Sequence, residues 1–183
     1  MPSNAGADEP RWLTDEQRDT WLPLVAVLLK LPAALDSQLQ RDSGLSHFHY
    51  LVLAMLSESP DRTRRMSDLA MVANGSLSRL SHAVSKLEDQ GWVRRHENAD
   101  DGRFTDATLT DAGWDKLVSA APGHVRAARA FVIDALTPEQ VRQLRAIAVQ
   151  ILAAVDPNCP PAPPAPTAPP ALTARQRPPK AAG

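Results

Sequence analysis

The fold is decided by residues 76–103, whose sequence is SLSRLSHAVSKLEDQGWVRRHENADDGR. Apolar side chains recur there at helical spacing, namely Leu77, Leu80, Val84 and Leu87. The pattern begins after the expected turn at 74–75, and Gly91 stops it. The sequence therefore predicts a helix over residues 76–90, with one apolar face packed on the domain and polar side chains on its other faces.

A β-hairpin is expected directly after this helix. Residues 92–95 and 104–109 are predicted strands, and residues 98–102 are the tip, where Asp-Gly is able to take positive φ. A short helix over about residues 67–73 and a turn at 74–75 are expected before it. Two helices joined by a tight turn and followed by a hairpin describe a winged helix-turn-helix. A helix fits the major groove of duplex DNA, and a hairpin can reach the neighbouring minor groove or backbone.

Further helices are expected on both sides of this unit. Helix starts are predicted at four capping residues: Thr14, Ser46, Thr110 and Thr137. Pro23 and Pro32 are expected to kink the first of these helices or to split it. The expected fold class is mainly α with a small β-hairpin wing, a winged helix-turn-helix with N- and C-terminal dimerisation helices.

The expected domain organisation has three parts. They are a disordered leader over residues 1–13, one domain over 14–155, and a Pro-rich disordered tail over 156–183. Within the domain, a DNA-binding lobe is expected at about 46–109 and dimerisation helices at about 15–40 and 110–155. Apolar stripes over 28–39 and 141–155 lie at opposite ends of the sequence, and a lone small domain would struggle to bury both. Pairing across a two-fold axis solves this, so we expect a homodimer.

Composition limits the possible functions. The formal net charge is −1, so any affinity for DNA must come from local placement of charge. Residues 1–10 lack the apolar region of a signal peptide, and the run over 22–35 is interrupted and too short to span a bilayer. We expect a soluble, cytoplasmic protein with no membrane partner. Cys159 is the only cysteine and lies in the tail, so control by thiol chemistry is not expected.

Residues 66–113 resemble the MarR family of transcriptional regulators. The matching segments are MSDLA at 66–70, SRLSHAVSKLE at 78–88, GWVRR at 91–95, DGR at 101–103 and LTDAG at 109–113. The family's Asp-x-Arg wing motif and its following Leu-Thr-x-x-Gly motif keep their spacing here. With the flanking helices, the resemblance covers about residues 20–155.

The resemblance implies a dimeric repressor that binds a palindromic operator in double-stranded DNA. The matching recognition-helix positions are Ser76, Ser78, Ser81, His82, Ser85 and Lys86. Arg103 is implied to enter the minor groove and Asp101 to brace the wing. His82 stands where many members carry arginine, which weakens phosphate attraction at neutral pH. From its chemistry alone, Arg79 is a further candidate for contact with a phosphate or a guanine edge.

Many family members release DNA when a small phenolic or lipophilic ligand binds between the dimerisation helices and the DNA-binding lobe. Trp21, His47 and Tyr50 are the candidate ligand-binding residues. The alternative is that Trp21 and Tyr50 are core residues and His47 is a surface residue at a helix start. His47 and His49 have no clear third ligand nearby, so neither a metal nor any other cofactor is expected.

Two other classes of function were considered. One is a protein-interaction module that kept the fold but lost DNA binding, because acidic residues nearly offset the basic ones in the lobe and the Pro-rich tail suits docking. The other is an enzyme. The sequence carries no nucleophile elbow, phosphate-binding glycine loop, metal-ligand cluster or paired carboxylates in an apolar setting, so no catalytic residues are expected.

Overall fold

The computed structural model describes residues 10–72 and 76–157 of the 183-residue chain. Of the expected leader it describes residues 10–13, and of the expected tail residues 156 and 157. The predicted turn at 74–75 and Cys159 lie outside the described residues.

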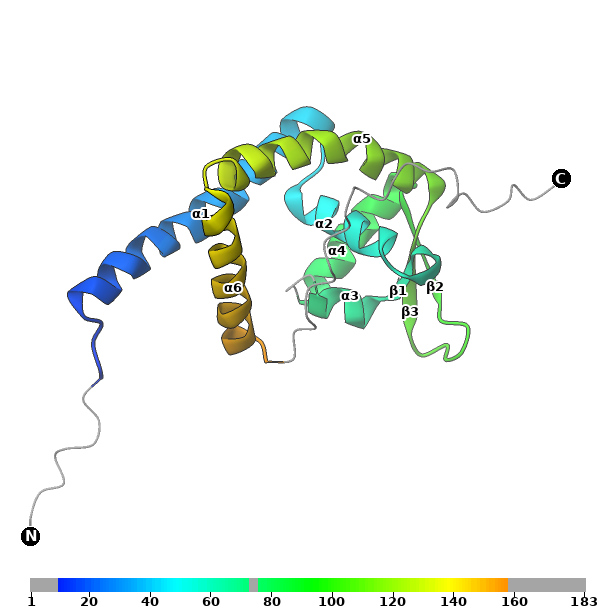
Figure 1. Ribbon diagram of the computed structural model, residues 1–183. Coiled ribbons are helices and arrows are strands. Elements are labelled where there is room, and N and C mark those ends of the chain that lie inside the picture. Colours follow the sequence, from blue (N-terminus) through cyan, green and yellow to red (C-terminus); the bar gives the residue numbers. More distant parts are fainter. Residues whose placement is uncertain (1–9, 73–75, 158–183) are drawn as a thin grey trace, which may run out of the picture.

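Helices dominate the described structure, and a small antiparallel sheet projects from one side (Figure 1). The elements in chain order are α1 Asp15–Ser43, α2 His47–Ser57, the 3-10 helix η1 Pro60–Arg62, β1 Thr63–Arg65, α3 Met66–Val72, α4 Leu77–Asp89, β2 Val93–Glu97, β3 Thr105–Leu109, α5 Asp111–Ala128, the π-helical segment η2 Arg129–Ile133 and α6 Pro138–Val155. The predicted fold class, mainly α with a β-hairpin wing, is confirmed.

The helices begin where capping chemistry predicts. The hydroxyl oxygens of Thr14, Ser46, Thr110 and Thr137 each accept a backbone N–H from the first turn of their helix. Thr14 and Thr137 form full capping boxes, because a glutamine three residues later also accepts the N–H of the capping residue. Local sequence therefore sets these helix starts with little help from tertiary packing.

The first helix departs from expectation. Pro23 and Pro32 lie inside a single helix of 29 residues, so the prediction that they split it is wrong. Each proline removes one backbone donor, but both are exposed, so solvent is available to the carbonyl left without a partner. The expectation of too short an apolar run is also corrected, since α1 is long and apolar enough to cross a membrane by length and composition alone. Core helices of soluble proteins and signal sequences meet the same test.

A strand that the sequence analysis missed completes the sheet. β1 pairs with β3, and β3 pairs with β2, giving the antiparallel order β1-β3-β2. Thr63 faces Thr108 in this register, and their hydroxyl oxygens are 2.8 Å apart. The wing is thus a hairpin whose second strand, β3, is the central strand of the sheet and also pairs with β1, the segment that leads into α3.

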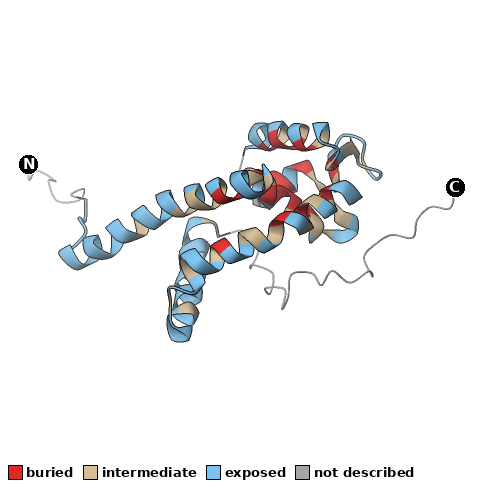
Figure 2. Ribbon diagram, turned by 90° about the horizontal axis from the view of Figure 1, so that it is seen from above, coloured by how far each residue is buried: buried red, intermediate tan, exposed pale blue. Residues whose placement is uncertain are grey.

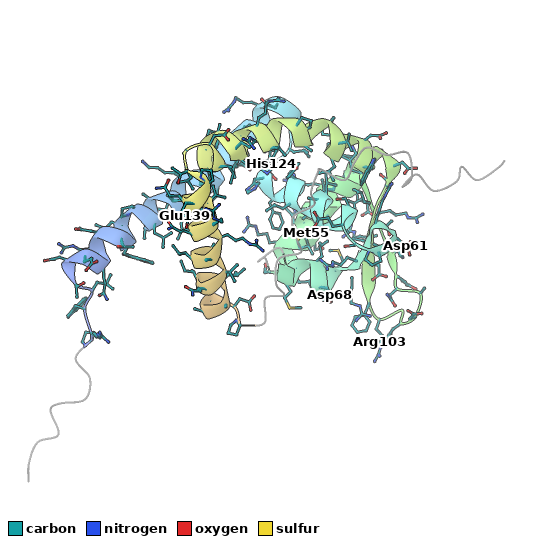
Figure 3. All side chains as sticks on the ribbon, in the orientation of Figure 1. Met55, Asp61, Asp68, Arg103, His124 and Glu139 are labelled. Carbon is teal, nitrogen blue, oxygen red and sulfur yellow. The ribbon has the colours of Figure 1, made fainter. Side chains whose placement is uncertain are left out.

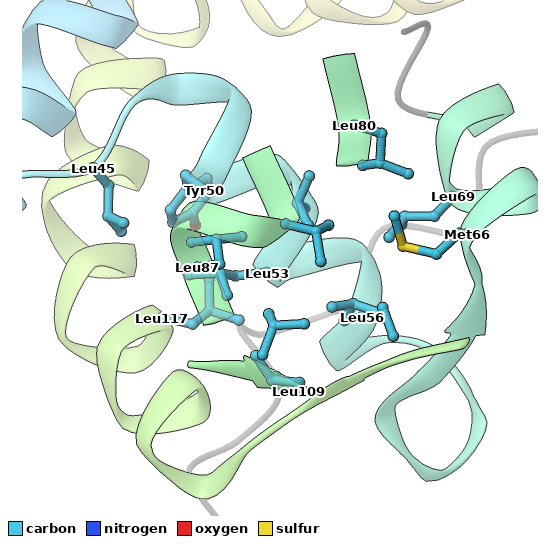
Figure 4. Packing of buried hydrophobic residues seen from close by; sticks show 14 of the residues in the cluster. Leu45, Tyr50, Leu53, Leu56, Met66, Leu69, Leu80, Leu87, Leu109 and Leu117 are labelled. Carbon is cyan, nitrogen blue, oxygen red and sulfur yellow. The ribbon is translucent and has the colours of Figure 1, made fainter. Parts of the chain in front are cut away.

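The hydrophobic core lies within α2–α4, the sheet and the adjoining ends of α1 and α5 (Figures 2 and 4). Its largest fully buried side chains are Leu39, Leu45, Leu53, Leu56, Leu69, Leu80, Leu87, Val52, Val84 and Val93. Most of α1 and the whole of α6 contribute no buried residue to it. The molecule is therefore a packed lobe with long helices projecting from it.

A tight turn joins α4, the wing and α5. Gly91 ends α4 with φ 72°, and the Trp92 N–H donates back to the Leu87 carbonyl at 2.9 Å. The Trp92 carbonyl accepts the Thr110 N–H at 3.0 Å, and the Thr110 hydroxyl donates to the Gly91 carbonyl at 2.7 Å. A Cβ at Gly113 would lie 2.1 Å from the Trp92 carbonyl oxygen, so only glycine fits there.

Three aromatic rings pack where α2 meets α5. The Tyr50 and His124 ring centroids are 4.3 Å apart, and those of His47 and His124 are 5.6 Å apart. Burial lowers the pKa of His124, and the nearby His47 lowers it further. Burial likewise lowers the pKa values of His47 and His49, although Asp36 opposes the shift in both. The fold therefore favours neutral imidazoles at this junction.

We predict that Gly113→Ala destabilises the protein by about 1–3 kcal/mol, because the new methyl group collides with the Trp92 backbone. Urea unfolding followed by circular dichroism measures this free energy. Gly102→Ala is the matched control, since its Cβ would come no closer than 3.7 Å to the Glu97 carboxylate. Equal stabilities of the two variants would contradict the account of the turn.

We also predict that the free energy of unfolding falls as the pH drops below about 6.5. The unfolded chain then takes up protons on histidines that the folded state keeps neutral, so acid favours unfolding. Unfolding titrations at about pH 7.5 and 5.5 test this, and His124→Gln should flatten the dependence. Stability that rises on acidification, or an unchanged dependence in His124→Gln, would show that burial of these rings does not govern it.

Candidate nucleic-acid interface

The helix α4 presents a polar face to solvent, opposite the buried Leu80, Ala83, Val84 and Leu87. The sequence-predicted residues lie on or beside this face. Ser76, Ser78, Arg79, His82 and Lys86 are exposed, and Ser81 and Ser85 are partly buried. Ser76 is the N-cap, and its hydroxyl oxygen accepts the Arg79 N–H at 3.2 Å. The helix thus carries hydroxyl, imidazole and ammonium groups on a surface that a DNA groove can approach.

Two side chains of α4 differ from expectation. Leu77 is 55% exposed rather than packed on the domain, because it is the first residue of the helix and lies at its free end. The Arg79 guanidinium lies 4.6 Å above the centre of the Phe48 ring of α2, a stacked arrangement that holds the cation close to the lobe. The Arg79 guanidinium is therefore held against the lobe rather than extended into solvent.

At the tip of the wing, an arginine and an aspartate form a tight pair. The Arg103 Nε donates to Asp101 Oδ1 at 2.9 Å, and its Nη2 donates to Oδ2 at 2.6 Å. These hydrogen bonds to the Arg103 side chain and backbone lower the pKa of Asp101. The Arg103 side chain is nevertheless 85% exposed, whereas that of Asp101 is 29% exposed. The carboxylate orients a cation that projects from the wing (Figure 3).

The turn itself is shaped by a different residue from the one expected. Gly102 is not among the positive-φ glycines, which are Gly44 and Gly91, so the expectation for Asp-Gly at this tip is wrong. Instead, the Asn98 side-chain oxygen accepts the backbone N–H groups of Asp100 and Asp101, both at 3.0 Å. A side-chain cap replaces the glycine conformation.

An ion pair that the sequence analysis counted only as offsetting charge joins the helix to the wing. Arg95 of β2 donates from Nε and Nη2 to Glu88 Oε2 at 2.9 and 2.6 Å. The Arg95 backbone N–H donates to the other carboxylate oxygen at 2.9 Å, and this bond is the main reason why the pKa of Glu88 is lowered. Glu88 and Arg95 therefore fix the angle between α4 and the hairpin. Their separation by seven residues, on either side of the end of the helix, is the feature of the sequence that could have indicated this ion pair.

A groove with a volume of about 280 Å³ separates α4 from the wing. Three arginines are among the residues that line it: Arg65, Arg95 and Arg103. The Arg65 guanidinium lies 3.9 Å above the centre of the Phe104 ring, across the β1–β3 pairing. Arg65 was not predicted as a site residue, because only β1, a strand that was also not predicted, brings it to the wing.

The three candidate ligand-binding residues are not all brought together. His47 and Tyr50 lie against His124 at the junction of α2 and α5. Trp21 is 49% exposed on the projecting part of α1, so the alternative of a core position does not hold for it. Tyr50 is buried at 8% exposure, as that alternative expected, and His47 is half-buried.

Comparison with known proteins places these features in a family. A MarR family model matches residues 43–103. An HTH-type transcriptional repressor of Mycobacterium tuberculosis is 36% identical over 102 residues, which are 56% of this chain and 71% of the relative.

Solved structures agree over a longer stretch. A MarR family transcriptional regulator from Streptomyces coelicolor, solved in complex with DNA, is 46% identical with a TM-score of 0.79, covering 83% of this chain and 95% of that one. AbsC, a MarR family transcriptional regulator from the same organism, is 36% identical with a TM-score of 0.75, covering 80% of this chain and 98% of its own. This chain belongs to the MarR family of transcriptional regulators.

Proposed function

We propose that this protein is a homodimeric repressor that binds a palindromic operator in double-stranded DNA. In this proposal α4 enters the major groove and Arg103 enters the neighbouring minor groove. The observation that carries it is the wing tip, where a strongly exposed arginine is held in one orientation by Asp101. A fixed, exposed guanidinium suits the negative potential of a narrow minor groove. The DNA complex of the relative that is 46% identical supports the same partner.

The polar face of α4 suits short-range contacts with bases more than general electrostatic attraction to DNA. We propose that Ser78, Ser81 and Ser85 bind phosphates or base edges at close range, since short hydroxyls permit close approach. Lys86, His82 and Arg79 are proposed to supply the longer contacts, and Ser76 to act at the helix start. The net charge of −1 implies weak non-specific binding, so specificity should depend on fit.

The acidic side chains of the lobe are paired with particular arginines, so they do more than reduce its net charge. Glu88 and Asp101 are each committed to an arginine of the same surface. Arg62 likewise pairs with Asp111 at 3.0 Å, and its guanidinium lies 4.6 Å from the centre of the Trp114 ring. These acidic residues orient hydrogen-bond donors, which supports binding to DNA despite the low net charge.

The projecting helices support a homodimer. Apolar side chains of α6 lie in a stripe that the single chain leaves exposed: Leu144, Ile147, Ile151 and Val155. On α1, Trp21, Leu22 and Leu28 are similarly exposed. Burying such surface against a second copy is favourable and would set two α4 helices on one face of DNA. We propose that residues 15–40 and 110–155 form this interface and residues 46–109 the DNA-binding lobe, and that the dimer acts in the cytoplasm.

We propose that a small phenolic or lipophilic ligand acts at the junction of α2 and α5. His47 and Tyr50 meet His124 there, and the His124 Nδ1 is buried without a hydrogen-bond partner within the described part of the chain. An unpartnered ring nitrogen beside apolar surface suits a hydroxyl-bearing ring. Release of labelled operator on titration with a simple phenol tests this finer point.

We predict that Arg103→Ala weakens operator binding by about 1–3 kcal/mol, because the minor-groove contact is lost. Operators selected from a random duplex library provide the probe, and fluorescence anisotropy measures the affinity. Arg41→Ala is a matched control, since it removes an exposed arginine in the last turn of α1, outside both the proposed interface and the proposed lobe. Binding of the selected duplex no tighter than a scrambled one would overturn the proposed function.

We predict that Ile147→Asp combined with Ile151→Asp converts the dimer to a monomer. Each change places a carboxylate in the apolar stripe, so the dissociation constant should rise by about 100-fold or more. Light scattering during gel filtration reports the mass. Gln143→Asp on the same helix is the control for added charge. A monomeric wild-type protein at micromolar concentration, or a double variant that remains dimeric, would contradict the proposed interface.

A further inference from the structure

We propose that Arg65 binds a backbone phosphate of DNA in the groove between α4 and the wing. This inference rests on the proposed function and extends it to a residue outside the family motifs quoted above. It concerns the sugar-phosphate strand that separates the two DNA grooves, rather than the bases within them.

The major groove and its neighbouring minor groove are divided by one sugar-phosphate backbone. If α4 occupies one groove and the tip of the wing the other, that backbone must pass between them. The space between them is the groove lined by Arg65, Ser81, Arg103 and Thr105. Its position therefore predicts a phosphate ligand.

The charge of the groove depends on which of its arginines are paired with carboxylates. Arg95 is paired with Glu88 and Arg103 with Asp101, so two of the three arginines that line the groove are already neutralised. Arg65 has no ion pair with any carboxylate in the described part of the chain, and its contact is with the face of the Phe104 ring. The groove thus keeps one positive charge to offer a phosphate. The pKa of Asp101 is lowered mainly by its hydrogen bonds to Arg103, and the charge of Arg65 lowers it further, so this carboxylate also tempers the charge of Arg65.

The Phe104 ring orients the Arg65 guanidinium. A guanidinium stacked on a ring keeps the N–H donors of its outer edge in the plane of the group, free to meet an anion. Phe104 is 37% exposed, and the Arg103 guanidinium also lies 6.0 Å from its ring centre. Phe104 therefore positions Arg65 beside the arginine of the wing. The hydroxyls of Ser81 and Thr105 lie in the same lining and can donate to further phosphate oxygens.

The test measures salt dependence with Arg65→Gln. Affinity for a labelled duplex of about 30 base pairs, three helical turns, is measured over a series of salt concentrations. Loss of one phosphate contact should reduce the steepness of the plot of log affinity against log salt. The expected reduction is about 0.9 for each protomer that binds the DNA. At about 0.15 M salt the affinity should fall about tenfold, and equally for selected operator and random duplex, because phosphates carry no sequence information.

Arg64→Gln is the matched control. It removes the same charge from the same strand, but alternation along β1 directs this neighbour to the other face, and Arg64 does not line the groove. Its salt slope should equal that of the wild type. Arg65→Lys keeps the charge but loses the planar stack, so it should keep the slope with an intermediate affinity. Circular dichroism verifies that each variant is folded.

Equal slopes for Arg65→Gln, Arg64→Gln and the wild type would overturn the assignment of Arg65. Loss of affinity confined to the selected operator would also overturn it, because Arg65 would then read a base. Either result leaves the proposed function standing if the wild type still prefers its operator. Failure of the wild type to prefer any operator would instead overturn the proposed function itself.

Discussion

The arrangement of α4 and the wing depends on the turn at Gly91 and Trp92. The positive φ of Gly91 ends α4, and the Trp92 carbonyl receives the start of α5 through the Thr110 N–H. Because a side chain at position 113 would collide with that carbonyl, the three elements meet in one arrangement only. Glu88 and Arg95 then add a second connection between α4 and β2. Helix and wing are thereby joined at two points, so their separation is set before any DNA arrives.

Electrostatics follow from this rigid frame. A chain with a net charge of −1 cannot rely on general attraction to phosphate. Its carboxylates act as braces: Glu88 holds Arg95, and Asp101 holds Arg103. Bracing reduces the entropy lost when an arginine side chain binds, so fewer cations give more selective contacts. Arg65, stacked on Phe104 instead of paired with an acid, is the complementary case, a cation kept for phosphate.

Local signals predicted much of this structure. Thr14, Ser46, Thr110 and Thr137 cap their helices as expected, because capping needs only residues within one turn. Asp101 and Arg103 also pair as the family motif implies, although their action on DNA stays a prediction. The predictions that failed concern features that depend on residues distant in the sequence. The strand β1 has three residues and exists through pairing with β3, more than forty residues away, so no period in the sequence reveals it.

The same dependence on residues distant in the sequence explains why some site residues were not predicted. Arg65 reaches the wing only through β1, and Glu88 meets Arg95 only after Gly91 has reversed the chain. The prediction for the prolines of α1 was wrong for a different reason. Proline inside a helix removes a backbone hydrogen bond, and this costs less free energy on an exposed helix surface. Gly102 likewise suggested a positive φ, whereas the Asn98 side chain shapes the tip.

The central claim is that a rigidly joined helix and wing read adjacent grooves of an operator at two symmetric half-sites. Hydroxyl-radical footprinting of the full-length protein on a selected operator tests it most directly, because the reagent reports access to the minor groove. The account predicts protected minor-groove patches in pairs related by a two-fold axis, each flanking a major-groove half-site. Protection that lacks this symmetry, or protection no different from that on scrambled DNA, would contradict it.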